Sequence, residues 1–360
     1  MVPFYINAFL ILFIDLIINV TFSDEQKKRK YICIINTIQI ILFISLRDVS
    51  VGNDTQNYVN FFEGAVRNPK FALNYEHFEI GFKYYVYAIA RLTSNPRIFL
   101  AIGAVLSVLP IGYIIYKYSK DCTISFYAFC TMEFIMFSMT GMRQNVAYFF
   151  VYTSFILFNS EKKQQKIIAL VLIVFAGFFH KSAWAFVILY GITLIKNTSW
   201  KKLIYVGGVV GSFIFRNQIG HLLVYRFYNN YEVNATGAYS RVFIVLIVLM
   251  LVCMYYDMIA IKSERDVVVA NGKSLFPVFA DSIFLTTFFF IIALVVSAAA
   301  RQGRYFFVFF TLLLPEFQYI IRKDQRFVFK VLCYILLTLL MFCLFPHNGL
   351  CTYGYYFWRN

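Results

Sequence analysis

Apolar runs of membrane-spanning length follow one another through most of this chain, separated by short polar segments. Apolar residue types make up 61% of the 360 residues and charged residues only 14%, against about a quarter in ordinary soluble domains. A water-soluble fold could not bury this much apolar surface, so the sequence predicts an integral membrane protein whose solvent is lipid. Because backbone polar groups in lipid must pair within their own segment, the runs should be helical.

The apolar runs divide into about twelve expected transmembrane helices, which predicts an all-α, polytopic helical bundle. Several runs are shorter than the ~20 residues that a helix normally needs to cross the hydrocarbon. We expect residues 1–360 to form a single integral membrane domain, since no internal repeat, linker or appended soluble segment stands out. The expected spans are 3–22, 31–46, 98–116, 122–139, 142–159, 167–180, 183–195, 202–215, 242–261, 277–298, 305–320 and 327–345.

Six short loops carry most of the lysines, and alternating the spans places all six on one side of the membrane. The positive-inside rule makes that side cytoplasmic. The first run has its basic flank after it rather than before it, which favours a retained helix with an external N-terminus. The loops contain Lys27, Lys28, Arg29 and Lys30; Lys117 and Lys120; Lys162, Lys163 and Lys166; Lys196, Lys201 and Lys202; Lys262, Arg265 and Lys273; and Arg322, Lys323, Arg326 and Lys330.

Two features of composition exclude whole classes of function. The formal net charge of +15 would suggest a nucleic-acid partner in a soluble protein, but here the basic residues flank apolar runs. We therefore expect no nucleic-acid partner, and attraction to anionic lipid headgroups instead. The seven cysteines are dispersed, without a CxxC pair, mostly inside apolar runs. Buried, inert thiols are the expectation, rather than a zinc site or a disulfide framework.

Two external loops are long enough to contribute to a site. The first covers residues 47–97, and within it 79–92 is a weakly apolar segment interrupted by Lys83 and Arg91. A full crossing there would reverse the side of every later loop, so we expect a re-entrant or interfacial helix. The second loop covers 216–241, and the segment from Pro346 is also external. Both loops are rich in tyrosine and phenylalanine, which either anchor at the membrane interface or stack on sugar rings.

A group of polar residues lies at the ends of expected spans but outside the basic loops. These residues come from four places far apart in the sequence, and the expected topology puts all of them on the external face. Ionisable groups at membrane depth are costly and usually mark function. Most of the basic ones are arginines, whose guanidinium fork binds phosphate oxygens in bidentate fashion. The alternative is that each arginine only extends to lipid headgroups. The residues are Arg47, Asp48, Asp54, Arg143, Gln144, His180, Lys181, Arg301, Gln302 and Arg304.

The acidic residues of the first external loop admit both a chemical and a structural interpretation. Asp54 follows the turn-favouring pair Gly52-Asn53. It either acts as a general base toward a sugar hydroxyl or caps a helix that begins near Gln56. Asp48 either belongs to the same site or neutralises the adjacent Arg47.

His180 lies in a tight turn between two apolar runs, in the sequence Phe178-Phe179-His180-Lys181-Ser182-Ala183. It is either a satisfied structural donor or a group that donates to phosphate and transfers a proton near neutral pH. No Asp and Ser at hydrolase spacing accompany it, so a nucleophilic triad is not supported.

Five segments together resemble the motifs of the EpsG family of Wzy-type exopolysaccharide polymerases. The order and hydropathy of the segments match over nearly the whole chain. The segments are Leu46-Arg47-Asp48 with Val51-Gly52-Asn53-Asp54-Thr55 and Tyr58, similar to R…VG-x-D-T-x-x-Y; Glu79-Ile80-Gly81-Phe82, similar to E-x-G-[YF]; Gly141-Met142-Arg143-Gln144, similar to G-[LM]-R-Q; His180-Lys181-Ser182-Ala183, similar to H-x-S-A; and Arg301-Gln302-Gly303-Arg304-Tyr305-Phe306, similar to the looser R-x-x-R-Y-[YF].

This resemblance implies a metal-independent membrane glycosyltransferase without a cofactor, in the bacterial plasma (inner) membrane, with a GT-C-like architecture. Such polymerases join polysaccharide repeat units on the external, or periplasmic, face. The implied donor is a growing glycan on undecaprenyl diphosphate, and the implied acceptor is a single lipid-linked repeat unit. A chain-length regulator and a flippase are further implied partners.

The resemblance also assigns roles to the candidate residues. Catalytic roles fall to Arg143, which would stabilise the leaving diphosphate, to His180, which would protonate it or hydrogen-bond to it, and to Asp54, which would orient or deprotonate the acceptor hydroxyl. Substrate binding falls to Arg47, Asp48, Tyr58, Gln144, Arg301 and Arg304. The alternatives are a lipid-linked oligosaccharide transporter or flippase, an O-antigen-type ligase and a sugar-modifying acyltransferase. Polar residues at span ends, rather than in broken helices at mid-bilayer, favour the transferase over the transporter.

Overall fold

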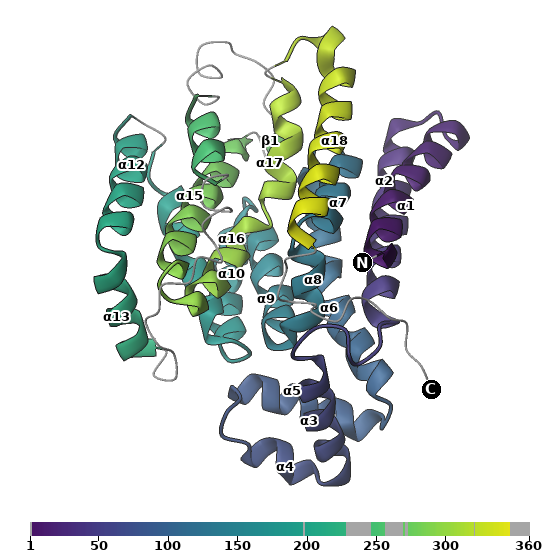
Figure 1. Ribbon diagram of the computed structural model, residues 1–360, viewed down its shortest axis with the longest axis vertical. Coiled ribbons are helices and arrows are strands. Elements are labelled where there is room, and N and C mark those ends of the chain that lie inside the picture. Colours follow the sequence, from purple (N-terminus) through teal and green to yellow (C-terminus); the bar gives the residue numbers. More distant parts are fainter. Residues whose placement is uncertain are drawn as a thin grey trace. The chain divides into compact units, whose positions relative to one another are not determined.

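The computed structural model describes residues 2–196, 199–227, 246–255, 269–270, 273–319 and 321–345. Contacts between residues divide the chain into two compact units, Met1–Trp184 with Lys323–Asn360, and Ala185–Arg322. Helices account for almost all of the described residues (Figure 1), which confirms the all-α prediction. The exception is a two-residue antiparallel ladder between β1 (Val269–Ala270) and β2 (Lys273–Ser274).

Helices of the first unit begin where the sequence supplies a cap. The side chains of Asp24, Asn68, Asn95 and Asp121 each accept a backbone N–H in the first turn of the helix that follows. Such caps pair donors that have no partner inside the helix. The helices are α1 (Val2–Thr21), α2 (Glu25–Ser45), α3 (Thr55–Arg67), α4 (Pro69–Asn74), α5 (Ile80–Leu92), α6 (Pro96–Tyr118), α7 (Cys122–Thr131), α8 (Phe134–Thr140), α9 (Met142–Phe158), α10 (Lys163–Gly177) and α18 (Arg326–Leu344).

The second unit is centred on α15, and α11, α12, α13, α16 and α17 all contact this helix. Gly303 brings α16 close to α15, since a Cβ at this position would lie 2.5 Å from the ring of Phe290. The helices are α11 (Val187–Thr193), α12 (Ser199–Ile214), α13 (Arg216–Phe227), Leu246–Tyr255, α15 (Phe276–Ala293), α16 (Ala300–Phe307) and α17 (Phe310–Glu316), with 3-10 turns at Ser297–Ala299 and Phe317–Tyr319.

The protein has several helices suited to a membrane, but the expected count of about twelve spans is not confirmed. Four helical segments among the described residues are long and apolar enough to cross, namely Val2–Thr21, Pro96–Tyr118, Phe276–Ala293 and Lys323–Cys343. A bent pair, α7 with α8, makes a fifth if it counts as one span. The GT-C-like architecture stays a prediction.

Several expected spans are interrupted. The expected span 305–320 is not one helix, because α16 ends at Phe307 and α17 begins at Phe310. The expected span 183–195 consists of the end of a 3-10 helix, Lys181–Phe186, followed by the seven-residue α11. Of the expected span 242–261, only 246–255 is described.

The expected span 122–139 is bent rather than straight. It divides at Met132-Glu133 into α7 and α8, whose axes differ by 56°. Every residue of α8 is buried, so this short helix is packed on all sides by protein rather than by lipid. Its C-terminal carbonyl groups have no partner further along the helix and can accept hydrogen bonds from other segments.

The segment expected as the first external loop, residues 47–97, contains three helices, α3, α4 and α5, which pack on one another (Figure 1). The helix expected over 79–92 is confirmed as α5, whereas its re-entrant or interfacial position stays a prediction. Aromatic rings fill the space between these helices, and the ring of Phe61 lies within 6.5 Å of the rings of Tyr75, Phe78 and Phe82. Of the second loop, α13 begins at Arg216, and residues 228–241 lie outside the described residues, as does the segment from Pro346.

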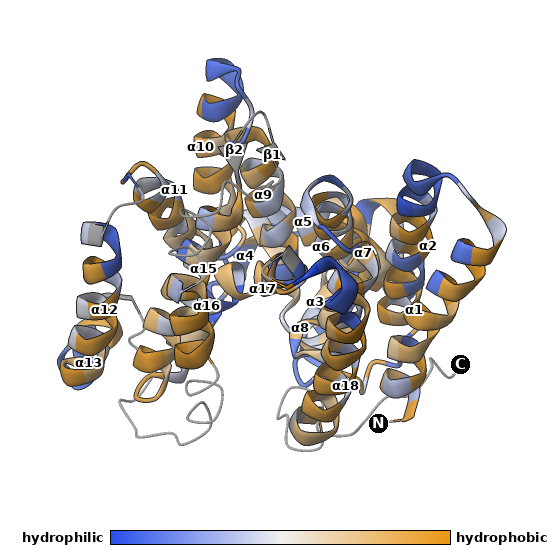
Figure 2. Ribbon diagram, turned by 90° about the horizontal axis from the view of Figure 1, so that it is seen from above, coloured by the Kyte–Doolittle hydropathy of each residue, from blue (hydrophilic) through white to orange (hydrophobic). Residues whose placement is uncertain are grey.

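Apolar side chains point outward along the long helices. Apolar residues dominate α1 and α18 (Figure 2), and Phe13, Val20 and Phe327 are each more than half exposed. A soluble protein rarely leaves such continuous apolar faces in water. The helices therefore support a membrane protein, as the sequence predicts.

Candidate functional site

The carboxylate of Glu79 joins the side chains of Arg143 and His180 in the first unit. Glu79 Oε2 accepts a hydrogen bond of 2.7 Å from Arg143 Nη1, and Glu79 Oε1 lies 3.1 Å from His180 Nδ1. The backbone N–H of Lys181 also points to Oε1, at 3.4 Å. Glu79 immediately precedes α5, Arg143 lies in the first turn of α9, and His180 follows α10. Three segments far apart in the sequence therefore meet at one carboxylate.

Two aromatic side chains complete the surroundings of Arg143. The guanidinium carbon lies 4.7 Å from the ring centroid of Phe78, a cation–π arrangement, and Nε points to the hydroxyl of Tyr58 at 3.4 Å. The side chains of Glu79, Arg143 and His180 are 12%, 20% and 10% exposed. The cluster is thus largely desolvated but still open to a molecule that approaches from outside the protein.

The neighbours of Glu79 keep its carboxyl ionised. Burial alone would raise the pKa of this carboxyl, but the hydrogen bond and charge of His180, together with the charge of Arg143, lower the pKa from the ordinary 4.5 to about 2. A carboxylate that stays charged at every physiological pH can hold both cationic partners in fixed positions.

Close backbone contact places α5 against the turn that carries His180. The N–H of Gly81 donates to the carbonyl of Phe178 at 2.8 Å, and a Cβ at Gly81 would lie 2.8 Å from that same oxygen. Only glycine permits this approach. Because Glu79 is two residues before Gly81 and His180 is two residues after Phe178, the contact aligns the two ionisable side chains.

The carbonyl oxygen of Met139, in the last turn of α8, contacts the segment from Arg47 to Thr55. It accepts a hydrogen bond of 3.1 Å from Arg47 Nη2 and lies 2.8 Å from the hydroxyl of Thr55. Gly52 reaches the same oxygen with φ of 87°, and a Cβ there would be only 2.6 Å away. A positive φ and so short a distance both require glycine. The first motif thereby packs directly against the segment that leads to Arg143.

Three of the predicted site residues, Arg47, Asp48 and Gln144, make hydrogen bonds within the protein around the site. Arg47 is only 1% exposed, and Nη1 donates to the carbonyl of Ile44. Asp48 Oδ1 accepts hydrogen bonds from the backbone N–H and the hydroxyl of Ser50, which closes the turn. Gln144 is buried and points to the hydroxyl of Tyr148 on its own helix. Roles of Arg47, Asp48 and Gln144 in binding substrate stay predictions.

Asp54 is exposed at the start of α3. It occupies the N-cap position, as the capping interpretation expects, but its side chain makes no capping hydrogen bond. Residues four apart on a helix share a face, so Asp54 lies on the side of α3 that carries Tyr58. Tyr58 in turn contacts Arg143, so the helix that begins after Asp54 leads to the cluster.

Arg301 and Arg304 belong to the second unit, on α16. They are three residues apart and so share a face of this helix, and Arg304 is only 6% exposed. That they join Arg143 around one diphosphate stays a prediction.

Two acidic residues that have no role in the sequence-based predictions occupy central positions in the structure. Glu79 belongs to the quoted E-x-G-[YF] segment, and an acid at the edge of a weakly apolar run was the signal that could have identified it. Asp281 lies inside α15 and forms a buried ion pair of 2.8 Å with Lys201, while Tyr205 donates to its other oxygen. Lys201, expected in a basic loop, is thus only 3% exposed.

The side chains of Arg143, His180 and Tyr58 give the site positive charge and hydrogen-bond donors. Among the described residues, no three His, Cys, Asp or Glu side chains gather as metal ligands, and metal independence stays a prediction. A fixed arginine and nearby hydroxyl groups can bind an anionic oxygen. A histidine held through Nδ1 by a carboxylate can transfer a proton to that oxygen.

One comparison with known proteins identifies a family. The family model described as the EpsG family matches residues 30–357. The matched range includes every residue of the cluster around Glu79. No curated protein and no solved structure matches the chain.

Proposed function

Since this chain belongs to the EpsG family, whose members are Wzy-like polymerases, we propose that it is a membrane glycosyltransferase that polymerises polysaccharide repeat units carried on undecaprenyl diphosphate. The reaction takes place on the external face of the plasma membrane. The cluster of Glu79, Arg143 and His180 carries the proposal, since it supplies cationic and proton-donating groups beside membrane helices.

Arg143 binds the donor diphosphate in this proposal. Glu79 and Tyr58 engage Nη1 and Nε, whereas Nη2 has no hydrogen-bond partner among the described residues. A guanidinium held at two nitrogens is already oriented, so it loses little freedom when the remaining N–H groups contact phosphate oxygens. It then stabilises the negative charge that grows on the diphosphate as the glycosidic bond breaks.

His180 protonates the departing diphosphate or donates a hydrogen bond to it. The carboxylate of Glu79 holds Nδ1 and thereby fixes the orientation of the imidazole ring. The arrangement is like other carboxylate–histidine pairs, in which the carboxylate orients the imidazole and stabilises its protonated form.

Asp54 acts on the acceptor. Its exposed carboxylate, on the side of α3 that carries Tyr58, orients or deprotonates the sugar hydroxyl that attacks the donor sugar carbon. The hydroxyl oxygen forms the new glycosidic bond, the old bond to diphosphate oxygen breaks, and the hydroxyl proton goes to Asp54. Arg301 and Arg304 bind substrate in the same proposal.

Deletion of the gene, complemented with variants, tests the proposal. Cells with Arg143→Ala at normal expression should accumulate single lipid-linked repeat units on the outer face and lose the polymer by about 10²-fold or more. The matched control is Arg91→Ala, which removes an exposed arginine from the last turn of α5. Its polymer should be unchanged.

Three results would contradict the proposal. Full-length polymer from Arg143→Ala excludes the diphosphate role. Repeat units that accumulate on the inner face indicate a flippase instead. Normal polymer that is not transferred to its final acceptor indicates a ligase.

A further inference from the structure

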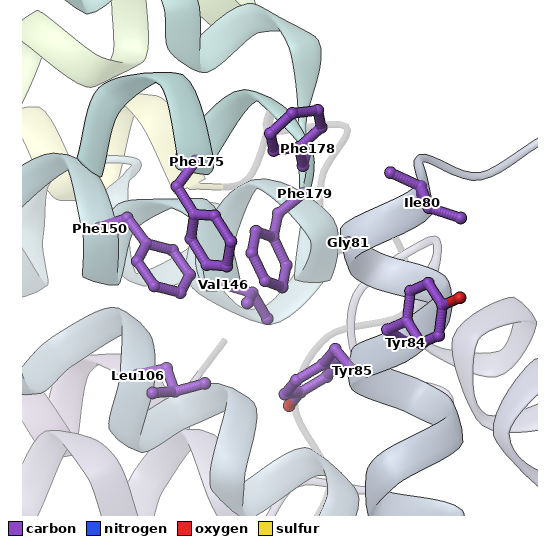
Figure 3. Close-up of a pocket in the computed structure, with 10 residues that line it drawn as sticks. All are labelled: Ile80, Gly81, Tyr84, Tyr85, Leu106, Val146, Phe150, Phe175, Phe178 and Phe179. Carbon is purple, nitrogen blue, oxygen red and sulfur yellow. The ribbon is translucent and has the colours of Figure 1, made fainter. Parts of the chain in front are cut away.

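A second site adjoins the Glu79 cluster in the first unit. A cavity of about 570 Å³ lies between α5, α6, α9 and α10, within the ~300–1,000 Å³ typical of small-molecule sites. Six of its ten lining residues are aromatic, and the hydroxyls of Tyr84 and Tyr85 are the only polar side-chain groups. Figure 3 shows the rings of Phe150, Phe175 and Phe179 on one side and Tyr85 on the other, all directed toward the same space.

The cavity and the ionic cluster share their walls. Gly81, which lines the cavity, is two residues from Glu79, and Phe179, also in the wall, directly precedes His180. Val146 lines the cavity one turn after Arg143 on α9, where residues three apart share a face. A single molecule that touches Arg143 and His180 with an anionic end can therefore place the adjoining apolar part in the cavity.

The side chains that line the cavity favour an apolar molecule over a sugar. A sugar needs several hydrogen-bond partners, whereas eight of the ten lining residues have no polar side-chain atom, and Tyr84 and Tyr85 supply one hydroxyl each. The side chains of Ile80, Tyr84, Phe175 and Phe178 are each more than 40% exposed, so the cavity opens at the protein surface rather than into the core. Aromatic walls suit a branched, unsaturated chain, whose methyl groups and double bonds can contact ring faces.

We propose that this cavity binds the isoprenoid units next to the head group of a polyisoprenyl diphosphate, while Arg143 and His180 bind the diphosphate. The inference rests on the proposed function and names the lipid subsite of the same centre. The cavity fixes the depth of the lipid relative to the membrane surface. The glycosidic carbon of the donor is thereby held at Arg143 and His180.

Photolabelling of the full-length protein in nanodiscs tests this assignment. The probe is undecaprenyl diphosphate with a diazirine in an isoprene unit near the head group, and labelled peptides are mapped by mass spectrometry. Label is expected on α9 and α10, in the peptides that contain Val146 and Phe175. Leu106→Trp fills the cavity from α6 and should reduce labelling by about tenfold, because several methylene contacts are lost. The matched control is Leu109→Trp, which adds an indole ring one helical turn away, where the leucine is 47% exposed. This variant should be labelled as strongly as the wild type.

The other outcomes overturn the assignment. Label confined to other helices would show that the tail lies elsewhere. Equal labelling of the cavity by phosphatidylglycerol with a diazirine in its acyl chain would show a groove for bulk lipid. Failure of the proposed function is distinct from both, because it appears as normal polymer in Arg143→Ala cells whatever the labelling pattern.

Discussion

Glu79 Oε2 and Arg143 Nη1 are 2.7 Å apart in space, although 64 positions separate these residues in the sequence. The same carboxylate reaches His180, 101 positions away, through its other oxygen. Glu79 thus contacts both proposed catalytic groups and controls the geometry of the site. No spacing rule in the sequence would pair Glu79 with either of them. The first prediction therefore concerns Glu79.

Glu79→Gln keeps the shape of the side chain but removes its charge. Arg143 and His180 then lose a charge-assisted partner, which is worth about 1.5–3 kcal/mol, so polymer formation should fall by about 10- to 100-fold. The measurement is polymer yield relative to membrane protein level. Glu63→Gln is the control, since Glu63 pairs with Arg67 only on the exposed surface of α3. Equal losses in both variants would exclude a specific role for Glu79.

The pH dependence of stability should identify the same carboxylate. The folded-state pKa of Glu79 is lowered from 4.5 to about 2, a shift equivalent to about 3 kcal/mol. Because the folded pKa is depressed, the stabilisation is complete above about pH 4.5 and is lost as the pH falls through about 2. Thermal unfolding in detergent should show a higher stability of wild type than of Glu79→Gln at pH 5, and this difference should be lost as the pH falls from 4.5 toward 2. A gap that closes between pH 7 and 5 would contradict the pairing.

Gly81→Ala should separate Glu79 from His180. The new Cβ would lie 2.8 Å from the carbonyl oxygen of Phe178 and would break the contact between α5 and the histidine turn. We expect polymer to fall by at least about tenfold, with a loss of stability of about 1–3 kcal/mol. Gly207→Ala on α12 is the control, because no atom lies within 4 Å of a Cβ there. A helical Gly→Ala substitution in open space should be neutral or stabilising.

Asp54→Asn distinguishes the chemical from the capping interpretation of that residue. Asparagine caps helices about as well as aspartate does, so α3 should keep its stability. Polymer should nevertheless decrease by about 10²-fold, because the amide cannot accept the hydroxyl proton. Normal polymer from a stable Asp54→Asn protein would assign the residue to the helix start alone.

Lys201→Met should destabilise the second unit by about 3–5 kcal/mol, because it leaves Asp281 buried without its cationic partner. Thermal unfolding of the purified protein measures the loss. The double variant Lys201→Met with Asp281→Leu should recover most of it, since two apolar side chains replace the pair. Lys163→Met, at an exposed position of α10, should leave the melting temperature unchanged.

Sequence patterns predicted the helical class and most helix positions because apolar runs in lipid have few alternatives to helix. They could not predict the breaks at Met132-Glu133 and between Phe307 and Phe310, since all four positions adjoin apolar runs without a Pro or Gly at the break. Tertiary packing decides such bends, as the complete burial of α8 indicates.

For the site, the sequence predicted Arg143, His180 and Tyr58, which the structure brings together around Glu79. It gave no role to Glu79, although this residue begins the E-x-G-[YF] segment, because the partners of a single acid are not visible in the sequence. The family resemblance gives Arg47 a substrate role, which stays a prediction, and the structure adds two hydrogen bonds from its guanidinium to backbone carbonyls. Whether an arginine contacts a carbonyl or a carboxylate here depends on contacts between segments that are 92 and 64 positions apart.

The Met139 carbonyl has a consequence for how the chain is made. Arg47, Gly52 and Thr55 are synthesised long before Met139, which follows Arg47 by 92 positions. Until α8 has been made, the guanidinium of Arg47 and the hydroxyl of Thr55 lack this oxygen as a partner and keep local acceptors, the carbonyl groups of Ile44 and Val51. Nascent chains arrested before residue 139 should thus leave the segment from Arg47 to Thr55 open to protease, and chains arrested well beyond it should protect that segment.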